Sequence, residues 1–325
     1  MALNKFNLKI KKKILPFKKT INVDADKSIS IRSFLIAAIS QNLSVASNVL
    51  ESEDVISTIN CLKKLGVKIK ISKNFCEIIG LGLNGFRYKD NQILDAGNSG
   101  TLGRLILGLL VHSKKKIRLK GDKSLSKRDF LRVINPLKKF GAKFNSNRGK
   151  LPIEIQGTNY SKPIKYYENK GSAQCKSAVM FAALNTSGET IIKAKKSRDH
   201  SELLFRYLKL PIKVIKRKKY DFIKIKGKNK IPALNYKIPS DISSAAFFII
   251  LTALARDSQL KIKNININPS RIGLLHVLKM MGIKISKLNI RDYKGERIAD
   301  LIVKSSNKIR PINCPTKLNS SAIDE

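Results

Sequence analysis

The feature that most constrains this chain is a helix-to-strand junction that occurs four times, about seventy residues apart. In each copy, apolar residues at helical spacing run into a glycine, or a proline in the third copy, and an alternating strand pattern follows. A glycine in this position is typical of the end of a helix. The chain is therefore predicted to consist of repeated units. The junctions lie at residues 61–69, 136–144, 207–214 and 277–285.

A second helix is predicted before each junction, and it opens with small polar residues. A strongly apolar run follows each opening, and a helix that is apolar on all sides is a buried one. Each unit thus contains a strand, a buried helix, a strand, an exposed helix and further strands, which predicts an α/β fold. The four openings are residues 26–32, 97–104, 171–176 and 240–244, and a fifth begins at Ser320.

The helix openings also indicate what kind of ligand the chain binds. A helix N-terminus carries unpaired N–H groups and about half a positive charge, so several that converge form an anion site. Lys27, Arg32 and Arg104 lie in these openings, where a cation opposes the helix dipole. An anionic ligand would offset that cost. The alternative is that the polar residues only cap helices and that Arg104 is solvated, and the pattern alone leaves it open.

Composition argues against several classes of protein. The longest apolar stretch, residues 245–255, is shorter than the roughly 20 residues of a membrane-spanning helix. No uninterrupted apolar segment follows the basic N-terminus, as it would in a signal peptide. We therefore expect a cytoplasmic protein without a membrane partner. The four cysteines and three histidines lack metal-ligand spacing, so neither a metal nor another cofactor is expected.

The net charge of +42 first suggests nucleic-acid binding. However, lysine far outnumbers arginine and is spread along the chain, and aromatic residues, which would stack on bases, make up only 6% of it. This pattern favours a compositional bias, and no specific nucleic-acid partner is expected. At 325 residues, the chain is long enough for two domains.

Two of the openings carry a specific resemblance to a known family. Residues 26–32 resemble the Gly-Asp-Lys-Ser-x-Ser-x-Arg signature of the 5-enolpyruvylshikimate-3-phosphate synthase family of enolpyruvyl transferases, and residues 97–104 resemble its Gly-Asn-x-Gly-Thr-x-x-Arg signature. Residues 121–128 look like its phosphoenolpyruvate-binding loop. Residues 171–178 and 197–200 are similar to segments of the second bacterial class. The resemblance covers essentially the whole chain.

The resemblance implies an inside-out barrel of two similar domains, each built from βαβαββ units. A chain of this family begins in one domain, forms the whole of the other and returns. Residues 1–16 and 237–325 are expected to form the first domain. Residues 17–236 are expected to form the second domain, with three units that bind shikimate 3-phosphate. The crossings would then fall near Pro16 and Tyr236.

The same resemblance implies transfer of the enolpyruvyl group of phosphoenolpyruvate to the 5-hydroxyl of shikimate 3-phosphate, a step of chorismate and aromatic amino acid biosynthesis. The reaction needs a base, an acid and dense positive charge for two phosphates and a carboxylate. By correspondence, the catalytic residues are Lys27 and Asp324, the latter as base. The residues expected at shikimate 3-phosphate are Lys27, Ser28, Arg32, Ser172, Ala173, Gln174, Arg198 and Asp324. Those expected at phosphoenolpyruvate are Lys27, Asn98, Gly100, Arg128 and Gln174.

Several positions depart from the family pattern or have simpler interpretations. Asp129 stands where the family usually has proline, and its carboxylate would weaken the Arg128 clamp if it turned inward. Asp241 is expected to cap a helix, and His200 to form a local hydrogen bond. Glycine at position 100 predicts sensitivity to glyphosate, which in this family occupies the place of phosphoenolpyruvate.

The resemblance also implies that the family continues beyond the position of Glu325. The first domain is therefore expected to be incomplete and to expose an apolar helix face over residues 247–254. We expect these residues alone to bind shikimate 3-phosphate weakly and to show no detectable turnover. A monomer is expected.

Two alternative functions are weighed against this one. The sister enzymes that act on UDP-N-acetylglucosamine carry Asn after the first lysine and a reactive cysteine in the second-unit loop. This chain has Ser28, and residues 121–128 contain no cysteine. The second alternative, a non-catalytic descendant that binds nucleic acid, is suggested by the charge, and its binding would fall steeply with salt.

Overall fold

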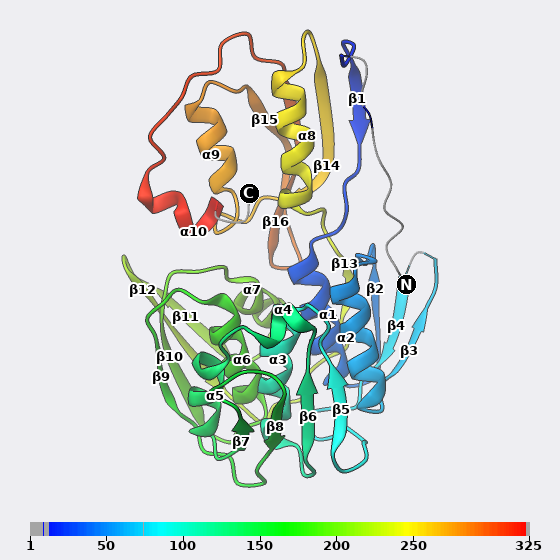
Figure 1. Ribbon diagram of the computed structural model, residues 1–325, viewed down its shortest axis with the longest axis vertical. Helices are drawn as coiled ribbons and strands as arrows, with labels where there is room; N and C mark the ends of the chain where they lie inside the picture. The colour runs from blue at the N-terminus through cyan, green and yellow to red at the C-terminus, as the bar shows by residue number, and fades with distance from the viewer. Residues whose placement is uncertain (1–8, 10–12, 74, 323–325) are drawn as a thin grey trace.

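The computed structural model describes residues 9, 13–73 and 75–322. They form two units stacked along the long axis of the molecule (Figure 1). The large unit has one hydrophobic core, built from residues 25–238. The small unit has a second core, built from residues 242–303 and joined by Phe17, Ile21 and Val23.

Four four-stranded sheets are present in the described part of the chain, and all have the same topology. The first strand pairs in parallel with the second, and the third and fourth strands are antiparallel to their neighbours. The sheets of the large unit are β13 (Asn235–Lys237), β2 (Leu43–Ser47), β4 (Phe75–Ile79) and β3 (Lys68–Ile71); β5 (Gln92–Asp95), β6 (Ile117–Lys120), β8 (Ile153–Gln156) and β7 (Lys143–Ser146); and β9 (Lys165–Glu168), β10 (Glu189–Lys195), β12 (Tyr220–Lys226) and β11 (Ile212–Lys216). The sheet of the small unit is β1 (Lys18–Ile21), β14 (Gln259–Asn266), β16 (Glu296–Lys304) and β15 (Ile285–Tyr293).

Each sheet is accompanied by one helix from a predicted polar opening. In the large unit these helices are buried along most of their length, and the sheets lie outside them (Figure 1). They are α1 (Lys27–Ala38), α3 (Gly100–Leu109) and α6 (Ala173–Leu184), and α8 (Ile242–Leu254) is their counterpart in the small unit. The other helices are α2 (Glu53–Lys64), α4 (Lys123–Ser126), α5 (Leu131–Lys138), α7 (His200–Tyr207), α9 (Gly273–Met280), α10 (Asn319–Ala322) and the 3-10 turns Leu110–His112 and Thr316–Leu318. The predicted fold class, an α/β fold of repeated units, is confirmed.

The repeated helix-to-strand junctions are confirmed in all four units. Gly66, Gly141 and Gly282 have φ angles of 89°, 109° and 92°, in the left-handed region that ends a helix at low cost only for glycine. In the third unit, which has no glycine here, Lys209 adopts this conformation with φ 54°. The chain then enters β11 three residues later, at Ile212.

In two of the sheets, the first strand lies far along the chain from the other three strands. β1 pairs with β14 of the small unit, with Lys18 opposite Gln259, and β13 pairs with β2 of the large unit, with Asn235 opposite Val45. The expected crossing near Pro16 is therefore placed too early, because Ile21 still lies in the sheet of the small unit. The chain changes unit between Ile21 and Ala25.

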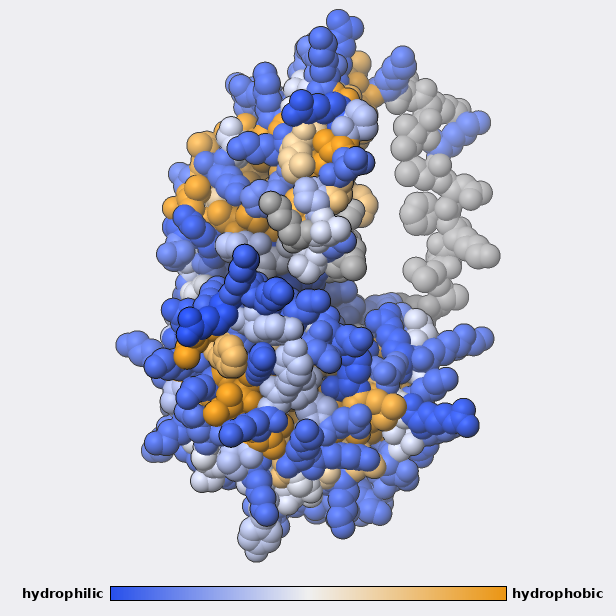
Figure 2. All heavy atoms as spheres, turned by 90° about the vertical axis from the view of Figure 1, so that its left-hand side faces the viewer, coloured by the Kyte–Doolittle hydropathy of each residue, from blue (hydrophilic) through white to orange (hydrophobic). Residues whose placement is uncertain are grey.

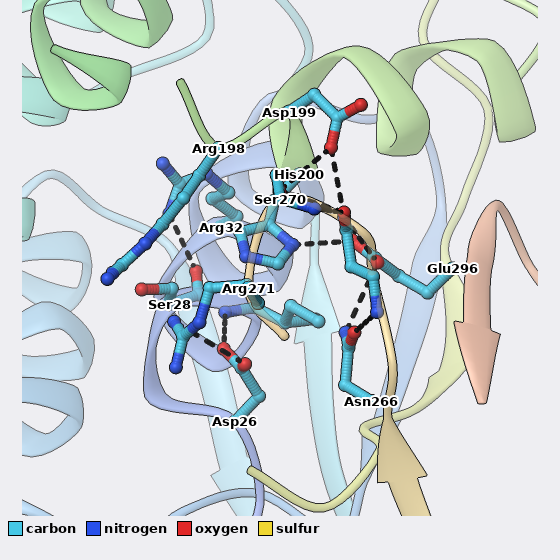
Figure 3. Close-up of polar contacts among 12 residues, drawn as sticks. Asp26, Ser28, Arg32, Arg198, Asp199, His200, Asn266, Ser270, Arg271 and Glu296 are labelled. Carbon is cyan, nitrogen blue, oxygen red and sulfur yellow. Dashed lines mark hydrogen bonds and ion pairs between the residues drawn. The ribbon is translucent and has the colours of Figure 1, made fainter. Parts of the chain in front are cut away.

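A buried polar cluster joins the two units (Figure 3). The His200 Nδ1–H of α7 donates to Glu296 Oε1 of β16 over 2.6 Å. Glu296 Oε2 accepts from the side chains of Asn266 and Asn268 at 3.2 and 3.1 Å. The expectation that His200 bonds locally is wrong, since its partner lies 96 residues away in the other unit.

An ion pair of Asp241 lies at the same junction. Asp241 caps α8 by accepting from the Ser243 N–H at 3.0 Å, as expected, and also pairs with Arg271 at 2.9 Å. Arg271 lies 4.0 Å from the buried Asp26 carboxylate. Burial and the neighbouring Asp26 raise the pKa of Asp241 to about 6, although Arg271 opposes the shift.

The surface differs between the units. On the face drawn in Figure 2, hydrophilic side chains cover most of the large unit, and hydrophobic side chains gather on the small one. The expected exposed face of α8 is present, with Phe247 and Leu254 at 79% and 70% exposure. No helix in the described ranges is long and apolar enough to cross a membrane.

The close contact between α3 and α6 predicts that one methyl group added at Gly108 strongly lowers stability. A Cβ at Gly108 would lie 2.1 Å from the carbonyl oxygen of Ala178, so backbone would have to move. We expect Gly108→Ala to lower the free energy of unfolding by about 1–3 kcal/mol or more, despite the better helix propensity of alanine. Urea unfolding followed by circular dichroism measures this. Gly103→Ala in the same helix is the control, because its Cβ would meet side chains and no backbone, the edge of the Phe130 ring at 3.3 Å and Leu125 at 3.7 Å. Equal stability of the two variants would contradict the contact.

The junction predicts that Glu296→Gln is destabilising even though the shape is kept. Both carboxylate oxygens of Glu296 accept hydrogen bonds from neighbouring side chains. In a glutamine, one of these oxygens becomes an NH₂ group, which would face an N–H donor of a neighbour. The glutamine also lacks the negative charge toward which the His200 Nδ1–H donates. We expect the free energy of unfolding to fall by about 3 kcal/mol. Glu189→Gln, whose ion pair with Lys224 is exposed, should change it by less than about 0.5 kcal/mol.

Candidate functional site

The opening of α1 places a lysine, a serine and an arginine at the end of the large unit that borders the small one. Asp26 caps the helix by accepting from the Ile29 N–H at 2.9 Å. The Lys27 side chain is half exposed and lies 3.6 Å from Asp54. The Ser28 carbonyl accepts from Arg32 one turn later, at 3.0 Å.

Arg32 is a buried cation, with only 3% of its surface exposed. Its guanidinium donates to the Ser28 carbonyl, to Ser201 Oγ at 2.9 Å and to Ser177 Oγ at 3.4 Å, all of which are uncharged oxygens. Burial, with a smaller contribution from the nearby Arg198, lowers the pKa of Arg32 to about 10, although the acidic residues Asp26, Glu202 and Glu296 oppose the shift. Among the described residues, the positive charge is thus held in place by oxygens other than those of a carboxylate.

The opening of α6 is held by a buried carboxylate. Glu168, 2% exposed, accepts from the N–H groups of Ser172 at 2.9 Å and Lys170 at 3.2 Å, and from Arg132 at 3.2 Å. Ser172 in turn caps α6 by accepting from the Cys175 N–H at 3.2 Å. Ala173, the first helical residue, therefore has a fixed backbone.

The opening of α3 is lined by two arginines. A Cβ at Gly100 would lie 2.9 Å from a guanidinium nitrogen of Arg104 and 3.1 Å from one of Arg128. Arg104 donates to Gln174 Oε1 at 2.8 Å and lies over the Phe130 ring, so it is not a solvated helix residue. Burial lowers the pKa of Arg104, and the charge of Arg128 adds to this shift.

Asp129 does not turn toward the clamp. Its carboxylate accepts from the Leu131 N–H at 2.7 Å, and its carbonyl accepts from Arg104 at 3.4 Å. The residue that replaces the family's proline therefore supports the start of α5. Asn98, in the loop before α3, is exposed.

The first turns of α6 bring the separate openings together. Gln174 bonds to Arg104 of α3, and also donates to Thr101 at 3.1 Å. Lys176 donates to the Arg198 carbonyl at 3.1 Å, and Ser177 bonds to Arg32 of α1. Residues from three of the repeated units therefore meet here, as the convergence of helix openings predicted.

Sequence reasoning missed several residues that hold this arrangement. Glu168 supports Ser172 from the preceding strand, Ser177 and Ser201 hold Arg32, and Lys176 pairs with Glu202. A lysine within an otherwise apolar helix was the available signal, but the sequence does not say where its side chain ends. Asp324, expected as the base, lies outside the described residues.

Comparison with known proteins agrees with this geometry. The model of the family EPSP synthase (3-phosphoshikimate 1-carboxyvinyltransferase) matches residues 11–319. A 3-phosphoshikimate 1-carboxyvinyltransferase of Ruthia magnifica subsp. Calyptogena magnifica is 42% identical over 306 residues, which are 94% of this chain and 69% of the relative. One from Caldicellulosiruptor saccharolyticus is 40% identical over 290 residues, which are 88% of this chain and 66% of the relative.

A solved structure gives the same result. EPSP synthase from Acinetobacter baumannii superposes with a TM-score of 0.85 at 34% identity, over 95% of this chain and 69% of that structure. The chain thus spans between 66% and 69% of the length of these three proteins. The family match, the identities and the shared fold establish that this chain belongs to the EPSP synthase (3-phosphoshikimate 1-carboxyvinyltransferase) family.

Proposed function

We propose that the protein transfers the enolpyruvyl group of phosphoenolpyruvate to the 5-hydroxyl of shikimate 3-phosphate, with release of phosphate. The observation that carries this proposal is the buried Arg32 guanidinium, which is bonded to uncharged oxygens beside the openings of α1 and α6. A buried cation at helix N-termini is unfavourable until an anion binds. A substrate with a phosphate and a carboxylate supplies that anion.

The residues divide between the two substrates. Arg32, Arg198 and the fixed backbone of Ser172 and Ala173 are suited to the anionic groups of shikimate 3-phosphate, with Ser28 and Gln174 as hydrogen-bonding groups. Gly100 leaves room for phosphoenolpyruvate beside Arg128, with Asn98 at the edge, and a planar guanidinium can bind a carboxylate or phosphate through two hydrogen bonds. These roles rest on the matched motifs.

Lys27 is assigned to both substrates. Its half-exposed side chain lies at the N-terminus of α1, and within the described part of the chain its ammonium pairs with Asp54 at 3.6 Å, near the surface. Such a group can move toward a ligand and take part in proton transfer. Asp324 is proposed as the base on its matched motif alone.

The two cores support a division into two domains. We place residues 25–238 in the domain that holds the described site residues, and residues 17–23 and 242–322 in the other. We propose a monomer in the cytoplasm, as suits a biosynthetic enzyme with two small, soluble substrates. The sister activity on UDP-N-acetylglucosamine and nucleic-acid binding are not favoured by any described contact.

Binding of shikimate 3-phosphate tests the proposal directly on the described residues. Isothermal titration should detect it, and Arg32→Met, which keeps the apolar stem but removes the charge, should weaken it about 100-fold. Arg217→Met, at an exposed position of the same domain, is the control and should leave Kd unchanged. Failure of the unaltered protein to bind shikimate 3-phosphate would contradict the proposed function, and equal Kd values for all three proteins would contradict the role of Arg32.

Gly100 predicts the response to glyphosate. A methyl group here would fill the space between Arg104 and Arg128. We expect Gly100→Ala to weaken glyphosate binding, measured by titration in the presence of shikimate 3-phosphate, by about 10-fold or more. Gly103→Ala, one turn along α3, should bind glyphosate as the unaltered protein does. If Gly100→Ala bound it equally well, phosphoenolpyruvate would not be bound beside Gly100.

A further inference from the structure

A buried ion pair lies directly behind the proposed substrate site. Lys176 Nζ of α6 is 2.6 Å from Glu202 Oε1 of α7, and the two side chains are 1% and 4% exposed. Glu202 Oε2 is buried without a hydrogen-bond partner among the described residues. A buried pair of charges that is not fully hydrogen-bonded is a poor source of stability, and two apolar side chains would fill the same space at no such cost. Stability alone therefore does not explain why two charged residues occupy these positions.

A second hydrogen bond of Lys176 indicates what the pair does. Its ammonium also donates to the carbonyl oxygen of Arg198 at 3.1 Å. Arg198 lies in residues 196–199, which form neither helix nor strand between the end of β10 and the start of α7. A rigid helix, α6, thus holds the backbone of an irregular segment at the position of its arginine.

The opposite side of the same segment is bonded to the small unit. Asp199 Oδ1 accepts from Asn268 at 2.9 Å. It also accepts from Ser270 at 3.3 Å (Figure 3). His200 bonds to Glu296, as described above. Asp199 Oδ2 also lies 3.4 Å from the exposed ammonium of Lys216, in β11 of the large unit. Without Lys176, the hydrogen bonds of Asp199 and His200 would hold the segment from the small unit, and this exposed ion pair would oppose them only weakly. With Lys176, the Arg198 backbone is fixed to the helix whose first turn carries Ser172 and Gln174.

We propose that Lys176 and Glu202 are positioning residues for Arg198. Glu202 holds the Lys176 ammonium, which holds the Arg198 carbonyl, so that the arginine is presented beside Arg32 and the opening of α6. The charge of Arg198 is close enough to act on Arg32. The inference rests on the proposed function in that Arg198 is taken to bind shikimate 3-phosphate. Neither Lys176 nor Glu202 need touch the substrate.

The test replaces the pair by apolar residues of similar volume, Lys176→Met with Glu202→Leu. Such a replacement keeps the packing and leaves no unpaired buried charge, but it cannot hold the Arg198 carbonyl. We expect the melting temperature to stay near that of the unaltered protein while Kd for shikimate 3-phosphate rises about 10-fold. In an Arg198→Ala background the same replacement should cause no further weakening. Wild-type affinity in the double variant would overturn the proposal, because a merely structural pair is fully replaced by packing.

A second measurement does not depend on the substrate. Amide hydrogen exchange, followed by mass spectrometry, should be faster in peptides that cover residues 196–200 of the double variant than in the unaltered protein. Unchanged exchange there would also overturn the proposal. If the unaltered protein does not bind shikimate 3-phosphate, the proposed function fails, while the exchange result still decides whether the pair holds this segment.

Two further proteins complete the experiment. Lys224→Gln with Glu189→Gln removes an exposed ion pair of the same domain and should change neither Kd nor the exchange of residues 196–200. If the Met and Leu variant does not fold, Lys176→Leu with Glu202→Met replaces it, since this pair exchanges the two apolar shapes and likewise leaves no donor for the Arg198 carbonyl. The same results are expected for it.

Discussion

The close approach of α3 and α6 is the contact on which the rest of the large unit depends. Gly108 brings the two helix backbones so near that no side chain fits between them. Helices that are apolar on all sides must be covered on all sides, and here the sheets cover them from outside (Figure 1). The polar openings of the helices, which cannot be buried in that core, are left at its end. The position of the site is a consequence of this packing.

The charges of the site follow from the same arrangement. Arg32 and Arg104 both lie near helix N-termini, and burial lowers the pKa of each. Their hydrogen bonds go largely to hydroxyl, amide and carbonyl oxygens, which hold the guanidinium groups without neutralising them. The protein therefore keeps positive charge available for a ligand and accepts a local loss of stability. Glu168 and Glu202, which do carry negative charge, bond to the supporting backbone and to Lys176.

The repeated pattern made much of the fold predictable. Helix ends at Gly66, Gly141 and Gly282 and helix openings at Ser172 and Asp241 depend on local chemistry, and local chemistry can be read from the sequence. The candidate site residues were proposed through matched motifs, and their roles stay predictions.

What could not be predicted depends on contacts between distant parts of the chain. His200 bonds to Glu296 and not to a neighbour, and Arg32 bonds to Ser201, 169 residues away. The crossing near Pro16 was misplaced because a short strand such as β1 is recognised by its partner β14, which the local pattern does not specify. The periodicity of apolar residues in a sequence does not indicate which distant residue a buried polar side chain will contact.

The chain crosses twice between the two units, once after β1 and once after β13, and the contacts at this junction therefore affect both units. Two chain crossings tie the units together, and next to them lie the contacts of Asp199 and His200 with the small unit. These two residues directly follow Arg198. A ligand that binds Arg198 therefore acts on a segment that is bonded to both units, to Lys176 in the large one and to residues such as Asn268 in the small one. A rotation of one unit against the other that moves these bonding partners apart would therefore alter the geometry of Arg198, the arginine proposed to bind shikimate 3-phosphate.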